Sequence, residues 1–169
     1  VTMYLGNRLQ AAEVREFGAD HVLVATGARW RRDGIGRWHA QPIAVLTASG
    51  VYTPDDLMDG RLPDGDVLVF DDDHYYMGPV LAQQLAAAGA RVRYVTTEGR
   101  AGAWSLYTQE QERAQRALLE LGIEIEVNSY LDGFDGATAT LACIFSGRAR
   151  RCAATAVVLV TAREPDEVL

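Results

Sequence analysis

The chain has 169 residues, a net charge of −7 and a 49% share of hydrophobic residues, enough to bury a core. The acidic balance argues against a nucleic-acid partner, because phosphate binding needs clustered cations. All 16 basic residues are arginines, which excludes chemistry that depends on a lysine. The two cysteines lack the spacing of a metal site, and we expect a cytoplasmic chain in which they stay reduced. We expect no membrane span, because no apolar run is long enough to cross a bilayer.

The first forty residues mix short apolar runs with an irregular segment. We expect a strand over 1–5, a short helix over 9–17 and a strand over 21–25 (HVLVA) that is covered on both faces. Residues 29–41 are rich in Gly, Arg and Trp without a period, so we expect a loop. The chain starts on Val1 inside an expected strand, which suggests a piece cut from a longer protein.

A regular alternation of strands and helices follows. Thr53 and Pro54 predict a capped turn of helix. Buried strand, helix, strand, helix and strand come next, and such crossovers make parallel neighbours. A meander of short antiparallel strands and a last buried strand complete the pattern. The predicted ranges are 67–70, 77–88 with Gly89 just past its end, 91–95, 108–121, 123–127, 130–151 for the meander and 156–160.

This order predicts an α/β fold, a Rossmann-like three-layer FAD/NAD(P)-binding domain with a mostly parallel sheet plus a small antiparallel meander. We assign residues 44–160 to a degenerate NAD(P)-type domain. Residues 1–43 are expected to belong to a partial ADP/FAD-type domain, and residues 161–169 to the segment that returns to it.

The turn after the first strand of this unit should carry the glycines that bind a dinucleotide. Those glycines permit the tight turn, the approach of the pyrophosphate and close helix packing. Here Asp71 and Asp73 stand at the first two glycine positions, and Tyr76 stands at the third. Carboxylates repel a pyrophosphate, and a tyrosine blocks close contact. We therefore expect the aspartates to satisfy the positive helix N-terminus themselves, in place of a nucleotide.

Other interpretations of this acidic turn stay open. Hard oxygen ligands suit a divalent metal, and a nucleotide could bind in an unusual way. Consecutive acids after a first strand are also typical of phosphoacceptor receiver domains, but those need a lysine that this chain lacks. Glu98 follows the second strand of the unit, near the place where a nicotinamide protein holds the ribose. No catalytic constellation and no metal site is predicted.

Several stretches together resemble the trimethylamine, dimethylamine and histamine dehydrogenases and the related 2,4-dienoyl-CoA reductase-like NADH:flavin oxidoreductases. They are 18–30 (GADHVLVATGARW), 71–77 (DDDHYYM), 104–110 with 118–123, and 158–165 (VLVTAREP), where Ala162 departs from the usual glycine. The acidic and aromatic stretch 71–77 is the discriminating one, because those dehydrogenases also lack glycines there.

The resemblance implies a flavin- and iron–sulfur-dependent oxidoreductase with FMN, a 4Fe-4S cluster and ADP or FAD elsewhere in the longer protein. Thr26, Gly27 and Ala28 would lie near the ADP or FAD. No cofactor is expected within this chain, whose second nucleotide-type domain would be a structural or docking element. The implied partners are the remaining domains and an electron-transfer flavoprotein. In the reductase branch, the alternative, this domain binds NAD(P)H through intact glycines.

Aromatic residues in the irregular segment are a further candidate surface. Trp30, Trp38 and His39 could contact a partner protein such as an electron acceptor, but a loop folded back on a neighbouring domain is the preferred interpretation. Trp104 and Tyr107 precede a helix and are expected to pack between domains.

Overall fold

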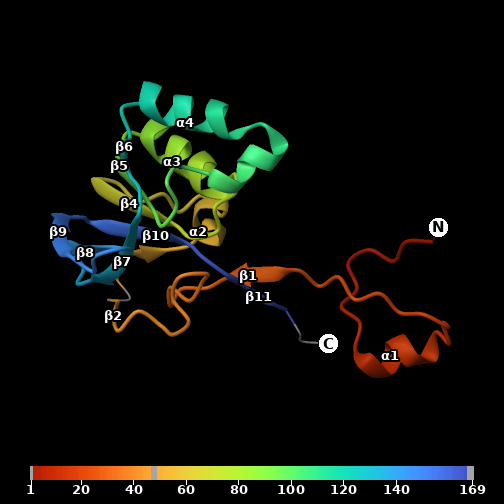
Figure 1. The fold of residues 1–169 in the computed structure, drawn as a ribbon. Coiled ribbons are helices and arrows are strands. Elements are labelled where there is room, and N and C mark those ends of the chain that lie inside the picture. The colour runs from red at the N-terminus through yellow and green to blue at the C-terminus, as the bar shows by residue number, and fades with distance from the viewer. Residues whose placement is uncertain (1, 47–48, 167–169) are drawn as a thin grey trace. The chain divides into compact units, whose positions relative to one another are not determined.

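A computed structural model describes residues 2–46 and 49–166, which form two compact units (Figure 1). The smaller unit contains the residues up to Arg29 and those from Glu164 onwards, and the larger unit runs from Trp30 to Arg163. These boundaries differ from the predicted ones at 43/44 and 160/161, and the assignment to nucleotide-binding domains stays a prediction. Among the described residues, no helix is long and apolar enough to cross a membrane.

A five-stranded parallel sheet forms the centre of the larger unit. Its strand order is β3-β10-β4-β5-β6, and every neighbouring pair runs parallel. Residues 67–70, 91–95 and 156–160 were predicted as strands, and all three runs are confirmed. The bounds are Val51–Tyr52 for β3, Asp66–Asp71 for β4, Arg91–Thr96 for β5, Glu124–Glu126 for β6 and Ala156–Val160 for β10.

Helices cover one face of this sheet (Figure 1). Strand alternation turns Val67 and Val69 towards them, into a core shared with Leu85 of α3 and Leu118 of α4. Gly89 follows α3 with a φ of +96°, the left-handed conformation expected after a helix C-cap. Helix bounds are Pro54–Met58 for α2, Met77–Ala87 for α3, Ala103–Thr108 for the 3-10 helix η1 and Gln111–Glu120 for α4.

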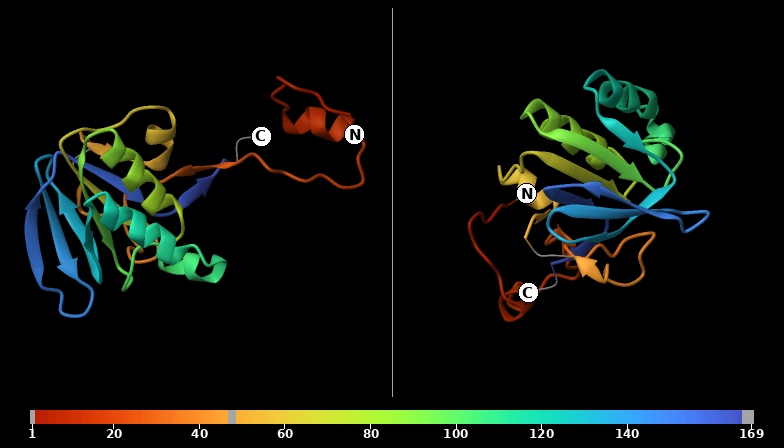
Figure 2. Two further views of the ribbon diagram at one scale, coloured as in Figure 1. Left: turned by 90° about the horizontal axis from the view of Figure 1, so that it is seen from above. Right: turned by 90° about the vertical axis from the view of Figure 1, so that its left-hand side faces the viewer.

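A second sheet covers the other face (Figure 2). Leu68 and Phe70 of β4 point to this side and pack with Leu131, Phe134 and other meander residues. The predicted meander is confirmed, because β7, β8 and β9 pair antiparallel, and β2 adds a parallel neighbour to β7. The strands are Val45–Leu46 (β2), Ser129–Phe134 (β7), Thr138–Cys143 (β8) and Ala149–Ala153 (β9). The α/β class with a mostly parallel sheet and an antiparallel meander therefore holds.

One predicted helix is interrupted. The range 108–121 was expected to be continuous, but η1 ends at Thr108 and α4 starts at Gln111. Gln109 between them has a φ of +63°. A residue in this left-handed conformation ends a helix, so the chain changes direction before α4 begins.

The smaller unit contains helix α1 (Ala11–Glu16) and little other regular structure. Strands β1 (Ala28–Trp30) and β11 (Arg163–Pro165) pair where the chain passes between the units. The expected strands over 1–5 and 21–25 are wrong for the described residues, which have no strand conformation there. A strand covered on both faces needs neighbours to pair with, and here the side chain of Leu23 is 96% exposed. Residues 1, 47, 48 and 167–169, which fall in predicted segments, lie outside the described residues.

Candidate functional site

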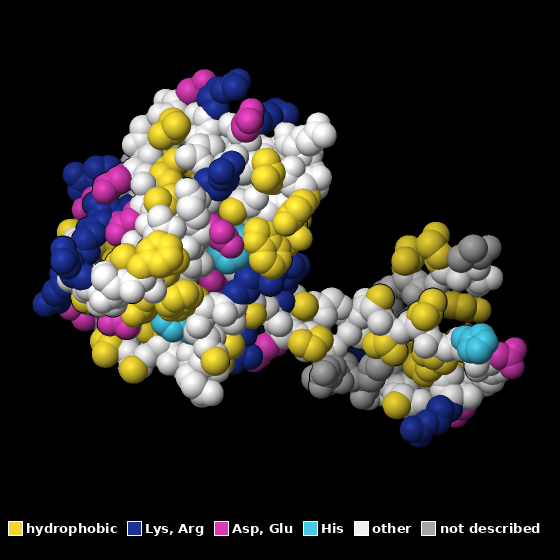
Figure 3. All heavy atoms as spheres, in the orientation of Figure 1, with side chains coloured by type: hydrophobic (Ala, Val, Ile, Leu, Met, Phe, Trp, Pro, Cys, Tyr) yellow, Lys and Arg dark blue, Asp and Glu magenta, His cyan; other side chains and the backbone are white. Residues whose placement is uncertain are grey.

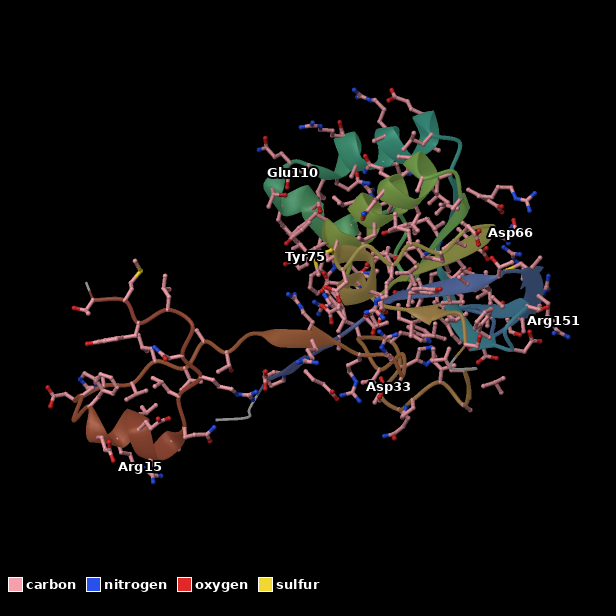
Figure 4. All side chains as sticks on the ribbon, turned by 180° about the vertical axis from the view of Figure 1, so that it is seen from behind. Arg15, Asp33, Asp66, Tyr75, Glu110 and Arg151 are labelled. Carbon is pink, nitrogen blue, oxygen red and sulfur yellow. The ribbon has the colours of Figure 1, made fainter. Side chains whose placement is uncertain are left out.

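The turn from β4 into α3, residues 71–76, lies at the C-terminal edge of the parallel sheet, where open α/β sheets bind ligands. We call it the crest turn. Figure 4 shows Tyr75 of this turn and Asp66, the first residue of β4, at opposite ends of the larger unit. The turn therefore stands where a dinucleotide's phosphates would be bound in a nicotinamide-binding domain.

The Asp71 carboxylate fills the inside of the crest turn. It is fully buried, and its Oδ1 accepts hydrogen bonds from the backbone amides of Asp73 at 3.1 Å and His74 at 3.0 Å. Its Oδ2 accepts a short hydrogen bond from the hydroxyl of Tyr94. That hydroxyl in turn accepts from the amide of Gly102 at 3.1 Å. Backbone amides that could hold a ligand anion are thus bound to a side chain of the same turn.

The expected capping arrangement differs from the observed one. Asp71 binds amides of the crest turn, whereas the N-cap of α3 is Tyr76, which makes no side-chain capping bond. Tyr76 is 61% exposed, so its ring does not block the close approach either. The close approach of helix α3 to the strand end occurs at Gly78 instead, where a β-carbon would lie 2.6 Å from Asp71 Cγ. Pro79 also removes one amide donor from the first turn of α3.

Burial dominates the electrostatics of this site. It raises the pKa of Asp71 to about 7, although the hydrogen bond from Tyr94 opposes the shift. Burial, together with the neighbouring Asp71 carboxylate, raises the pKa of Tyr94 well above its usual range. The Tyr94 hydroxyl therefore stays protonated, while the enclosed Asp71 carboxyl can take up a proton near neutral pH.

Asp72 and His74 form a second buried pair in the crest turn. Asp72 Oδ2 accepts hydrogen bonds from the backbone amides of Arg37 and Trp38, while its Oδ1 lies 3.7 Å from His74 Nε2. Burial raises the pKa of Asp72 and lowers the pKa of His74. His74 has a φ of +68° and its ring packs against Trp104. Neither Asp72 nor His74 was singled out as a binding residue, because no periodic signal links Asp72 to Arg37, which lies 35 positions earlier in the chain.

The other residues predicted in the larger unit also have internal partners. Asp73 is nearly buried, at 9% exposure, and donates its amide to Asp71 and to the carbonyl of Val160. Glu98 Oε1 accepts the indole N–H of Trp104 at 3.3 Å. Asp71, Asp73 and Glu98 thus lie around one end of the sheet as expected, but in contacts within the protein.

Thr26, Gly27 and Ala28 belong to the smaller unit. Thr26 Oγ1 donates to the carbonyl of Asp166, and the amide of Asp166 donates to the carbonyl of Gly27 at 3.0 Å. All three residues are exposed. Figure 3 shows hydrophobic side chains, in yellow, on the visible face of this unit, and the side chains of Leu23, Leu5 and Met3 are at least 74% exposed.

No metal centre is visible within residues 2–46 and 49–166, where no three His, Cys, Asp or Glu side chains gather in a metal-binding group. The hypothesis of a divalent metal at the crest turn therefore has no geometric support. Cys143 and Cys152 are both free thiols in the part of the chain that the structure describes.

The aromatic residues of the irregular segment pack inwards. Trp30 is 7% exposed and lies under the guanidinium of Arg163. Trp38 stacks on Tyr130 of the meander, with ring centroids 5.1 Å apart, and is 41% exposed. His39 Nε2 lies 2.8 Å from the carbonyl oxygen of Leu131. These contacts differ from the expected packing on a neighbouring domain, because the loop folds back against the larger unit itself.

Comparison with known proteins assigns the larger unit. Residues 52–154 match the family model of the OYE-like second alpha/beta domain. The chain belongs to this family. Over 120 residues it is 36% identical to dimethylamine dehydrogenase of Hyphomicrobium sp. (strain x), a match covering 69% of the chain and 16% of that enzyme.

Two solved structures of amine-oxidising enzymes are also similar to this OYE-like domain and its flanking residues. The 6-hydroxypseudooxynicotine amine oxidase of Pseudomonas geniculata N1 is 42% identical with a TM-score of 0.91, over 99% of this chain and 25% of that one. Histamine dehydrogenase of Rhizobium sp. 4-9 is 37% identical with a TM-score of 0.88, over 96% and 26%. The chain therefore corresponds to about a quarter or less of these relatives, and the predicted resemblance to the amine dehydrogenases is confirmed.

Proposed function

We propose that residues 30–163 form a nucleotide-free, structural domain of a flavin- and iron–sulfur-dependent oxidoreductase that acts on amines or related substrates. The observation that carries this proposal is the Asp71 carboxylate, bound to two amides of the crest turn. In a Rossmann-like domain those positions serve the pyrophosphate. Here they are occupied by a side chain that is covalently part of the turn.

The charges around the turn oppose a nucleotide as well. Asp71, Asp72 and Asp73 are consecutive and at most 9% exposed. A pyrophosphate brought to this edge would have to displace carboxyl groups that already bind the local backbone amides, and any carboxylate left ionised beside it would repel it. Glu98, which could bind a ribose hydroxyl, holds the indole of Trp104 instead. The reductase-like alternative, in which NAD(P)H binds here, requires these contacts to be replaced.

The chemistry of the longer enzyme follows from its relatives and is part of the proposal. FMN and a 4Fe-4S cluster would be held by domains other than this one, since the described residues contain no cluster of metal ligands. ADP or FAD would lie near Thr26, Gly27 and Ala28 of the smaller unit. The exposed apolar side chains of that unit, such as Leu23, suit packing against further parts of the enzyme.

Docking of an electron-transfer flavoprotein is a second proposed role. Exposed aromatic side chains support it, because tyrosine is favoured in protein interfaces. Tyr76 at the start of α3 is 61% exposed, and Tyr107 in η1 is 83% exposed. Replacing both by alanine should weaken binding of the carrier, measured by surface plasmon resonance, while replacing Phe145, which is 80% exposed in the turn between β8 and β9, by alanine serves as the control.

The test of the first role is a calorimetric titration of the 169-residue chain with NADH, NADPH and ADP up to millimolar concentration. We expect no binding of NADH or NADPH. Micromolar affinity for either would contradict the proposed replacement of phosphate by Asp71 and would favour the reductase-like alternative. Binding of ADP alone would point to the smaller unit, and Gly27→Asp should then abolish it.

A further inference from the structure

A short segment from Ile35 to His39, which we call the strap, crosses the C-terminal edge of the parallel sheet. It belongs to the orange stretch between β1 and β2 in Figure 1. The carbonyl of Ile35 accepts the amide of Ala162 just after β10, at 3.2 Å. The amide of Gly36 donates to the carbonyl of His39 at 3.0 Å, which closes the strap into a turn.

The strap contacts each structure that surrounds this edge. The guanidinium of Arg37 lies 4.1 Å from the ring centroid of Trp104 in η1. Trp38 stacks on Tyr130 of β7, and His39 bonds to the neighbouring Leu131. A segment with contacts to the end of β10, to η1 and to the meander covers the edge of the sheet at which α/β domains bind ligands.

One carboxylate holds the strap to the sheet. Asp72 Oδ2 accepts both the Arg37 amide and the Trp38 amide, the latter at 2.9 Å. Two successive amides directed at one oxygen form an anion-binding arrangement of the kind that binds phosphates and carboxylates. Gly36 permits the approach, because a β-carbon there would lie 2.3 Å from the same oxygen and 3.1 Å from Thr161 Cβ.

We propose that the strap is an intramolecular lid over the C-terminal edge of the parallel sheet, and that the carboxylate of Asp72 is its internal ligand. The inference goes beyond the proposed function. Asp71 explains why the crest turn offers no amides to a phosphate, whereas Asp72 explains what holds the strap over this edge of the sheet. The two aspartates act on opposite sides of the sheet, because successive side chains of an extended chain alternate. The amide site of the strap is accordingly a site for a small carboxylate, filled by the protein itself.

Hydrogen–deuterium exchange of the 169-residue chain tests the lid. In Asp72→Ala, peptides that contain Arg37 and Trp38 should exchange about tenfold faster or more, because both amides lose their acceptor. Sodium formate should slow this exchange again by occupying the vacated site, while sodium chloride at equal ionic strength should not. Asp73→Ala is the matched control, since it removes a neighbouring carboxylate that accepts neither amide, and it should leave the strap unchanged.

Gly36→Ala disturbs the same contact by adding a methyl group to the strap, where it overlaps Asp72 Oδ2. It should also speed exchange of the strap, but formate should not reverse the effect, because Asp72 is still present to compete for the site. This variant keeps the test decisive if Asp72→Ala fails to fold. Exchange within about twofold of the unmodified protein in both variants would overturn the lid. Fast exchange in Asp72→Ala that formate leaves unchanged would overturn the assignment of Asp72 as an internal ligand. Because the readout is amide exchange, either result is independent of the nucleotide titration.

Discussion

Gly78 lies against the Asp71 carboxyl group so closely that a β-carbon at position 78 would be 2.6 Å from Cγ and 2.7 Å from Oδ2. This contact joins the end of β4 to the first turn of α3. It leaves no room between the strand end and the helix for any group larger than the carboxylate itself. The helix therefore packs on Asp71 in the place where other domains of this architecture pack on a phosphate.

Replacing Gly78 by alanine should destabilise the protein. The added methyl group overlaps a side chain that three hydrogen bonds hold in place, and overpacking of this kind costs about 1–3 kcal/mol. Urea unfolding measures the change. Gly99→Ala is the matched control, because a β-carbon there meets nothing within 4 Å and its φ is unstrained. Equal stability of the two variants would mean that the Asp71 contact is looser than described.

The stability should also depend on the protonation of Asp71. Folding raises its pKa from the model-peptide value of about 4 to about 7, so the folded protein holds this proton more tightly. The resulting stabilisation is fully present below pH 4 or so and is lost as the pH rises through the folded pKa. Its upper bound by linkage is on the order of 4 kcal/mol.

The variant Asp71→Asn isolates this effect, because an amide does not titrate while Asp72, Asp73 and His74 remain. The difference in unfolding free energy, unmodified protein minus variant, should decrease from pH 4 to pH 8. A difference that increases with pH would instead mean that folding stabilises the ionised carboxylate.

Tyr94→Phe should destabilise the domain without changing its packing. The change removes one hydroxyl that donates to Asp71 and accepts from Gly102, leaving two buried polar groups short of a partner. Such a loss costs about 1–3 kcal/mol. It should also raise the pKa of Asp71 further, because the bond from Tyr94 lowers it. Tyr107→Phe, at an 83% exposed position, should stay within about 0.5 kcal/mol.

Local sequence patterns predicted the larger unit well and the smaller unit poorly. The run 67–70 and the spacing of Leu81 and Leu85 predict a strand and a helix, because each buries a face within its own unit. Residues 21–25 have an equally apolar strand pattern, but a strand forms only beside others, and no described strand pairs with them. Pattern alone cannot distinguish these two situations.

The sequence predicted polar contacts at the turn after β4 but not the partners that make them. Replacement of glycines by Asp71 and Asp73 correctly located polar contacts at the end of β4. The partners were not predictable, because Tyr94 lies 23 residues away and Arg37 lies 34 residues before the turn. Side-chain alternation along the strands is the one sequence feature that could separate these partners. It places Asp71 and Tyr94 on the helix-covered face of the sheet and Asp72 on the other face.

Asp56, in helix α2, carries a buried charge outside the crest turn. Its carboxylate has no exposed surface, contacts the guanidinium groups of Arg32 and Arg61, and accepts the Thr53 amide at 2.8 Å at the start of α2. Burial alone would raise the pKa of Asp56, but the Arg32 and Thr53 hydrogen bonds hold it below its usual value. A lowered pKa contributes stability above the unfolded pKa near 4, and this contribution is lost as the pH falls through the folded value.

Replacing Asp56 by asparagine should therefore remove stability at neutral pH, by about 1–3 kcal/mol, since a buried carboxylate loses its charge-assisted bonds to two half-exposed arginines. The loss should shrink as the pH falls towards 3, where the unmodified carboxylate also becomes protonated. Chemical unfolding at pH 7 and pH 3 measures both quantities. Asp59→Asn is the control, because Asp59 is 71% exposed and its contact with Arg61 is longer, at 3.4 Å. A loss for Asp56→Asn that is the same at both pH values would show that packing around the cap, and not the charge, provides the stabilisation.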